Sequence, residues 1–419
     1  MVFSSGEKIE GRYSRKEMLR LIAYMGPALL VSVAYIDPGN FASDIETGAT
    51  TGYVLLWVVW LAGLMGMLLQ YLSGKLGLAT GKSLPELVSA TLRKRKYIIP
   101  YWLSAEAASA AVDLAEFLGT VLALNLLFGI PYLEATYIAV FDVFLMIYLS
   151  KKGFRKLEKA FFLFVGMIGL SYVYELFLVK PDISSTVYYS VIPEIHQAYV
   201  VLIMSIIGAT VMPHVLFYHS DLVRQKVKGA DPATKRATLG YHRNDTILFL
   251  GAASFVNAAM LIMAAGGFHA RGLNDVQTIN DAYYTLLPLF GKLAGYMFVA
   301  ALLSSGISAS TLGTLAGQSV MEGMLGRNVN PWKRRLVTRF INVIPTTIAI
   351  MIGLNPFYIL FYSQVVLSIM IPLPMIPLIV YTSQRSRMGE FVNRKYTVAL
   401  AVLSAATIIV FNVYYLATL

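Results

Sequence analysis

Two short stretches combine a proline with polar side chains inside segments that are otherwise apolar. Residues 34–40 read AYIDPGN, and residues 208–214 read GATVMPH. A carboxylate, an amide, a thioether and an imidazole are costly at membrane depth, so residues of this kind usually have a function there. Together they offer the chemistry of a binding site for one divalent transition-metal ion.

Four residues of these stretches are the candidate metal ligands. Asp37 supplies an anionic oxygen and Asn40 a neutral one. The proline in each stretch removes a backbone donor, so carbonyls upstream, including that of Ala209, lose their helical partners. Met212 adds a soft sulfur, which suits later transition metals better than Mg²⁺ or Ca²⁺. The set therefore favours Mn²⁺, Fe²⁺, Co²⁺ or Cd²⁺.

Further polar residues in apolar segments form a second set, which we expect to carry protons. Asp113 and Glu116 are three residues apart, so they share one helix face. The basic candidates for the same path are His214, His219, Arg334, Arg335 and Arg339. Two structural alternatives stay open: an ion pair between the carboxylates and an arginine, and simple anchoring by the arginines at the membrane surface.

Three single residues leave their roles open. Gln364 is a buried amide that either binds metal or water, or joins two helices by a hydrogen bond. Asn257 has the same two possibilities. His219 lies at the inner end of its segment, where it is either part of the proton path or solvated.

The composition indicates that these residues belong to a helical membrane protein. Of the 419 residues, 57% are hydrophobic and 14% are charged, and mean hydropathy is +0.65. Continuous apolar runs predict helices rather than a barrel. The absence of cysteine excludes disulfides and thiolate sites. We expect eleven spans, at residues 21–49, 53–73, 99–128, 132–150, 160–179, 198–218, 245–267, 293–321, 336–354, 357–383 and 397–418.

The loop charges predict the orientation. With an inside N-terminus, all but three of the 34 Lys and Arg residues lie in inside segments; the exceptions are Lys180, Arg271 and Lys292. The net charge of +11 then reflects membrane topology rather than nucleic-acid binding. The first twenty residues are polar and basic, so we expect no removable signal peptide. The N-terminus is predicted to be cytoplasmic and the C-terminus external, in the plasma membrane.

The spans divide into two halves that each begin with an interrupted helix. Because each half has five spans, the second half must run with inverted topology, which is typical of secondary transporters with a site at the midplane. No nucleotide-binding motif is visible, so a gradient must supply the energy. The predicted units are a cytoplasmic segment 1–20, a first repeat 21–179, an external loop 180–197, a second repeat 198–383, and an internal loop with span eleven, 384–419.

With these residues in place, the sequence resembles the Nramp family of divalent-metal transporters. The resemblance rests on DPGNFASDIETGATTGY, DLAEFLGTVLALNLLFGIP, GATVMPHVLFYHSDLV, TLAGQSVMEGML, RRLVTRFINVIP and SQVVLSIMIP. It implies an all-α integral membrane protein of LeuT-like fold that imports Mn²⁺ or Fe²⁺ together with protons. It also implies the metal and proton roles given above, with no resident cofactor, and we expect a monomer. Val215, Ile307 and Met370 depart from the familiar pattern at secondary positions.

Other functions remain as alternatives. A sodium-coupled amino-acid symporter on the same architecture would have to place a substrate carboxylate beside Asp37, which repels it. A Mg²⁺-carrying relative would not need the sulfur of Met212. A channel or a metal sensor is the third possibility, although the inside loops are too short for a soluble output domain.

Overall fold

The computed structural model describes residues 26–141, 154–273, 278–327 and 330–418, and these ranges contain helices and connecting segments but no strand. The helices of the first half are α2 (Pro27–Ala34), α3 (Pro38–Thr51), α4 (Leu56–Thr80), α5 (Leu84–Leu92), α6 (Arg95–Phe128), α7 (Tyr132–Ala139) and α9 (Phe154–Val179). The later helices are α10 (Ile183–Val191), α11 (Val200–Thr210), α12 (Pro213–Lys226), α13 (Pro232–Gly267), α14 (Ile279–Phe290), α15 (Lys292–Leu325), α16 (Pro331–Met351), α17 (Pro356–Met370), α18 (Pro372–Thr382), α19 (Arg385–Met388) and α20 (Lys395–Thr418).

Within the described residues, eight helical stretches are long and apolar enough to cross a membrane. They correspond to eight of the eleven predicted spans. Of the other three, the first is divided between α2 and α3, the ninth corresponds to the shorter apolar helix Leu336–Met351, and the fourth is described only as far as α7 and residue 141. The cytoplasmic segment 1–20 lies outside the described residues.

Several helices differ from the predicted spans, and two of these differences have an identifiable cause. α13 begins at Pro232 rather than near residue 245, because the Asp231 side chain accepts a hydrogen bond from the Thr234 amide at 2.6 Å and caps the helix. The predicted tenth span is two helices, α17 and α18, which meet at Ile371, where Pro372 begins the second helix. Polar cap residues and a second proline are signals that apolar length alone does not reveal.

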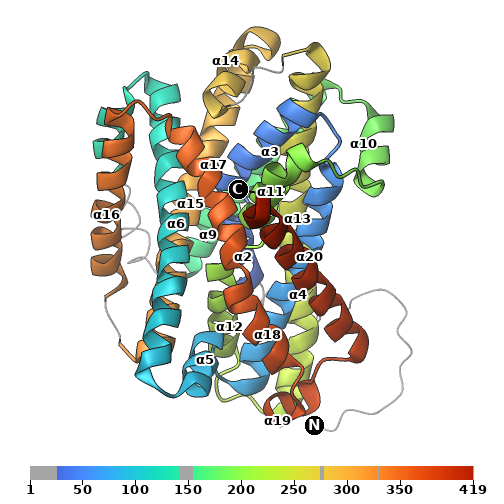
Figure 1. Ribbon diagram of the computed structural model, residues 1–419, viewed down its shortest axis with the longest axis vertical. Coiled ribbons are helices and arrows are strands. Elements are labelled where there is room, and N and C mark those ends of the chain that lie inside the picture. Colours follow the sequence, from blue (N-terminus) through green and yellow to red (C-terminus); the bar gives the residue numbers. More distant parts are fainter. Residues whose placement is uncertain (1–25, 142–153, 274–277, 328–329, 419) are drawn as a thin grey trace.

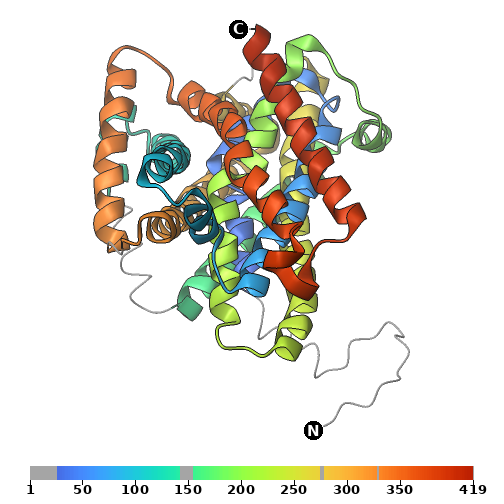
Figure 2. The same cartoon turned by 60° about the horizontal axis from the view of Figure 1, so that its bottom comes forward.

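The two interrupted helices run through the middle of the bundle in opposite directions. In Figure 1 the chain passes from α2 upward to α3, and from α11 downward to α12. α10 and α14 lie at the top, and α5 and α19 at the bottom. Figure 2 shows α16 and α20 on opposite sides of this centre. The antiparallel course brings the two breaks to the same depth.

Candidate metal site

The first break is a helix start that leaves one carboxylate oxygen free. Asp37 has extended backbone, and Pro38 is the first residue of α3. One carboxylate oxygen of Asp37, Oδ1, accepts hydrogen bonds from the backbone and side-chain nitrogens of Asn40, at 2.8 and 2.9 Å. The other oxygen, Oδ2, is buried and has no hydrogen-bond partner among the described residues. A buried carboxylate oxygen in this position favours a cation nearby.

The second break meets the first directly. The Asn40 side-chain nitrogen donates to the Ala209 carbonyl at 3.1 Å, and the Thr210 hydroxyl donates to Asn40 Oδ1 at 3.4 Å. Met212 has extended backbone at the start of α12. Asp37, Asn40, Ala209 and Met212 are all completely buried. The structure thus brings together the two stretches that carry the four predicted ligands, although 169 residues separate Asn40 from Ala209.

Gln364 of α17 lies against both breaks. A methyl group added at Gly39 would collide with the Gln364 side chain, and one added at Gly208 would collide with the Gln364 carbonyl. The Gln364 amide nitrogen donates to Leu360 O and Ser363 Oγ, whereas its oxygen is buried without a partner among the described residues. This oxygen is a second unsatisfied acceptor beside the breaks, in keeping with a predicted ligand role.

The donors and acceptors fit a cation only after one side chain turns. The nitrogen of the Asn40 amide, rather than its oxygen, faces Asp37 and Ala209. Because a metal ion requires oxygen or sulfur there, the Asn40 amide must rotate so that Oδ1 replaces the nitrogen. The C-terminal ends of α2 and α11 also lie at the breaks, where the negative end of each helix dipole favours positive charge.

Two side chains hold the first break in shape. Asn257 of α13 donates to the Tyr35 carbonyl and to Asn40 Oδ1, each at 3.0 Å. Ser305 of α15 donates to the Ile36 carbonyl at 2.6 Å. These bonds satisfy carbonyls that the interrupted helix leaves without partners, so the unwound backbone is stable at membrane depth. Asn257 therefore joins α13 to the first break by hydrogen bonds, which is one of the two roles considered for it.

The proposed proton residues fall into separate groups. His214, the second residue of α12, is 1% exposed, and neither ring nitrogen has a hydrogen-bond partner among the described residues. Asp113 accepts from the Asn342 amide at 2.9 Å, and its other oxygen lies 3.7 Å from the Arg339 guanidinium. Glu116 is also buried and lies against Gly313 of α15. Asp113 and Arg339 thus form an ion pair of the kind expected as a structural alternative.

Arg339 is completely buried and has several partners at once. Besides Asp113, it donates to the Ser310 hydroxyl at 2.6 Å, and its guanidinium lies 4.9 Å from the centre of the Phe117 ring. Arg334 pairs with Glu106 of α6 instead of Asp113 or Glu116. A small cavity lined by Glu106, Arg334, Asp113 and Gly313 joins the two pairs.

The two remaining candidates for the proton path are Arg335 and His219, and neither is seen to join these ion pairs. The side chain of Arg335 is not among the described ones. His219 is completely buried, which rules out the solvated alternative. Its Nδ1 lies 3.1 Å from Gln70 of α4, and its ring lies 5.1 Å from that of His242 of α13. It therefore contacts α4 and α13, whereas Asp113 contacts α16.

Comparison with known protein families shows to which family the chain belongs. The family model for natural resistance-associated macrophage protein-like sequences, Nramp, matches residues 28–418. The chain belongs to the Nramp family. A relative from Deinococcus radiodurans named divalent metal cation transporter MntH is 39% identical over 98% of this chain and 93% of its own.

Solved structures of similar transporters confirm the fold. A variant of the Eremococcus coleocola manganese transporter is 30% identical, with a TM-score of 0.85 over 99% of this chain and 89% of its own. MhsT in complex with L-phenylalanine is 12% identical, with a TM-score of 0.60 over 92% of this chain and 98% of its own. The predicted all-α, LeuT-like architecture with broken first and sixth spans is therefore correct.

Several residues that support the breaks and the ion pairs of this Nramp chain could not be identified from the sequence. Ser305 and Glu106 look like ordinary polar residues in a sequence, and only contacts show that one supports the break and the other pairs with Arg334. Gly39 and Gly208 flank the predicted ligands, and their close approach to α17 has no sequence signal of its own. A glycine beside a proline break was the available hint.

Proposed function

We propose that this protein imports Mn²⁺ and Fe²⁺, and also accepts Cd²⁺ and Co²⁺, in symport with protons by alternating access. Family membership makes the chain a multi-pass divalent metal cation transporter and not an enzyme. The observation that carries the finer proposal is the contact between the breaks, in which Asn40 bonds to both Asp37 and Ala209.

The ligand set supports the choice of metal. Asp37 and Gln364 each have a buried oxygen without a donor among the described residues, and Met212 begins the helix after the second break. With Asn40 rotated and the Ala209 carbonyl freed, four oxygens and one sulfur become available. Sulfur beside oxygen favours Mn²⁺, Fe²⁺, Co²⁺ and Cd²⁺ over ions that prefer all-oxygen shells.

The buried ionisable residues support proton coupling. His214 follows Met212 by two positions and has no hydrogen-bond partner among the described residues. α12 and α6 both pack against α15, where Glu116 lies beside Gly313. Gly313 also lines the small cavity that Asp113, Arg334 and Glu106 share. We infer a proton route from the metal site along this line.

Amino-acid symport is the second candidate function, because MhsT shares the fold of this chain. MhsT was solved with L-phenylalanine, but at 12% identity this likeness concerns only the fold. The free oxygen of Asp37 disfavours a substrate carboxylate at the first break. Calorimetric titration separates the two functions: we expect heat with Mn²⁺ and none with amino acids.

Flux measurements test the transport proposal. In proteoliposomes that contain a pH dye, Mn²⁺ influx should acidify the lumen. Met212→Ala should weaken uptake of Cd²⁺ and Mn²⁺ and admit Ca²⁺, whereas Met204→Ala, which removes a buried thioether of α11, should retain the selectivity. Mn²⁺ influx at constant lumenal pH would reject proton coupling. Unchanged exclusion of Ca²⁺ by Met212→Ala would reject the sulfur ligand.

A further inference from the structure

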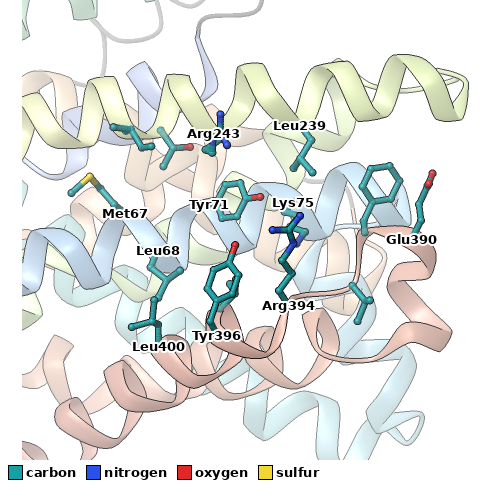
Figure 3. A pocket seen from close by; sticks show the side chains of 15 residues that line it. Met67, Leu68, Tyr71, Lys75, Leu239, Arg243, Glu390, Arg394, Tyr396 and Leu400 are labelled. Carbon is teal, nitrogen blue, oxygen red and sulfur yellow. The ribbon is translucent and has the colours of Figure 1, made fainter. Parts of the chain in front are cut away.

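A cavity of about 530 Å³ lies between α4, α13 and the first turns of α20 (Figure 3). Met67 and Leu68 of α4 and Leu400 of α20 line one end. The rings of Tyr71 and Tyr396 lie in the middle, and charged side chains line the other end. The cavity therefore has an apolar part and a polar part, joined by aromatic residues of the kind that mark membrane interfaces.

Three cations line the cavity. They are Lys75 of α4 and Arg394 just before α20, which lie together beyond the two tyrosines, and Arg243 of α13, which lies beside Tyr71. None of the three forms an ion pair with another residue in the described part of the chain. The carboxylate that lines this end, Glu390, pairs instead with Arg236. The cavity wall thus carries three positive charges, none of which is paired with a carboxylate in the described part of the chain.

Lys75 is the most informative of the three. Its residue is only 7% exposed, although a lysine is rarely buried unless it is paired. Its ammonium donates to the neutral Asn393 side chain at 2.8 Å and lies 5.8 Å from the centre of the Tyr71 ring. An ammonium that only served the positive-inside distribution would extend into water. This buried, incompletely paired ammonium indicates an anionic ligand.

We propose that the cavity binds one anionic phospholipid, with the headgroup phosphate at the three cations and an acyl chain along the apolar end. Arginine binds phosphate oxygens through two parallel hydrogen bonds, and lysine adds a point charge. Basic pockets between membrane helices are suited to anionic headgroups on the cytoplasmic side. The distribution of Lys and Arg among the loops predicts that this end of the bundle faces the cytoplasm. A free phosphate ion would leave the apolar end unused.

The proposed lipid site gives a role to the last span, to which no part in metal or proton transport was assigned. α20 lies outside the two repeats, yet it forms one wall of the cavity, while α4 and α13 belong to different repeats. A lipid in this position contacts all three helices at once. It therefore holds the last span to both halves of the transporter.

Native mass spectrometry of the detergent-solubilised full-length protein tests the lipid site. Phosphatidylglycerol is titrated against phosphatidylcholine, and the fraction of protein with one retained lipid is measured. We expect the wild type to prefer phosphatidylglycerol. Arg394→Gln, at an exposed position, should weaken that binding about fivefold, and the Arg243→Gln, Arg394→Gln double variant about 25-fold.

Lys395→Gln is the matched control, because Lys395 is also exposed and adjacent to Arg394 but does not line the cavity. It should bind phosphatidylglycerol like the wild type. Equal affinity of Arg394→Gln and Lys395→Gln would overturn the proposal, as would equal binding of the two lipids. Displacement of phosphatidylglycerol by an equal concentration of inorganic phosphate would also overturn it, because the site would then recognise phosphate alone.

Discussion

The close approach of α11 to α17 makes Gly208→Ala a sharp test of how the metal site is held. The added methyl group would overlap the Gln364 carbonyl oxygen and lie 2.8 Å from the Ser368 amide nitrogen. Both are backbone atoms of a helix, so they cannot turn away as a side chain can. α11 must move instead, and the carbonyl of Ala209 moves with it.

The expected effect has two parts. Overpacking costs about 1–3 kcal/mol, and the better helix propensity of alanine returns about 1 kcal/mol, so the free energy of unfolding should fall by about 0–2 kcal/mol. Ligands of a working site are held to within about 0.5 Å, so a shift of about 1 Å should weaken Mn²⁺ binding tenfold or more. Thermal unfolding in detergent and calorimetric titration with Mn²⁺ measure the two parts.

Gly251→Ala is the control for this substitution. Gly251 is a helical glycine of α13, and no atom lies within 4 Å of a methyl group added there. This variant should be slightly more stable than the wild type and should bind Mn²⁺ normally. The packing argument would be refuted if Gly208→Ala matched Gly251→Ala in both stability and Mn²⁺ affinity.

Two further substitutions test the surroundings of the site. Asn257→Ala leaves the Tyr35 carbonyl without its side-chain donor, so it should lower the free energy of unfolding by about 1–3 kcal/mol; thermal unfolding without loss would contradict this. Arg339→Met leaves Asp113 buried without its cation, so it should lower the free energy of unfolding by about 3–5 kcal/mol. Adding Asp113→Asn to the same chain should recover part of this loss. Equal unfolding temperatures of the single and double variants would exclude the ion pair.

Much of the architecture could be predicted because it depends on local and summed properties of the sequence. Apolar length predicted the spans, and a proline beside polar residues in spans one and six predicted the breaks that α2, α3, α11 and α12 display. The odd number of spans in each half predicted the opposite direction of the two broken helices. The site was therefore predicted from the paired breaks and from the expected inversion of the two halves, and not from individual contacts.

Contacts between distant residues could not be predicted in the same way. Arg334 was one of the arginines that could have paired with Asp113 or Glu116, but it pairs with Glu106, about two to three turns earlier on α6. The choice depends on how far α16 is shifted along α6, which hydropathy does not determine. The burial of His219 against Gln70 likewise depends on which face of α12 meets α4.

Cadmium X-ray absorption most directly tests the claim that the two breaks form one metal site. The chain contains no cysteine, so any sulfur bound to Cd²⁺ must come from methionine. We predict a shell of oxygen and sulfur neighbours in the wild type. The sulfur contribution should disappear in Met212→Leu and remain in Met204→Leu. An all-oxygen shell in the wild type, or sulfur retained in Met212→Leu, would contradict the account.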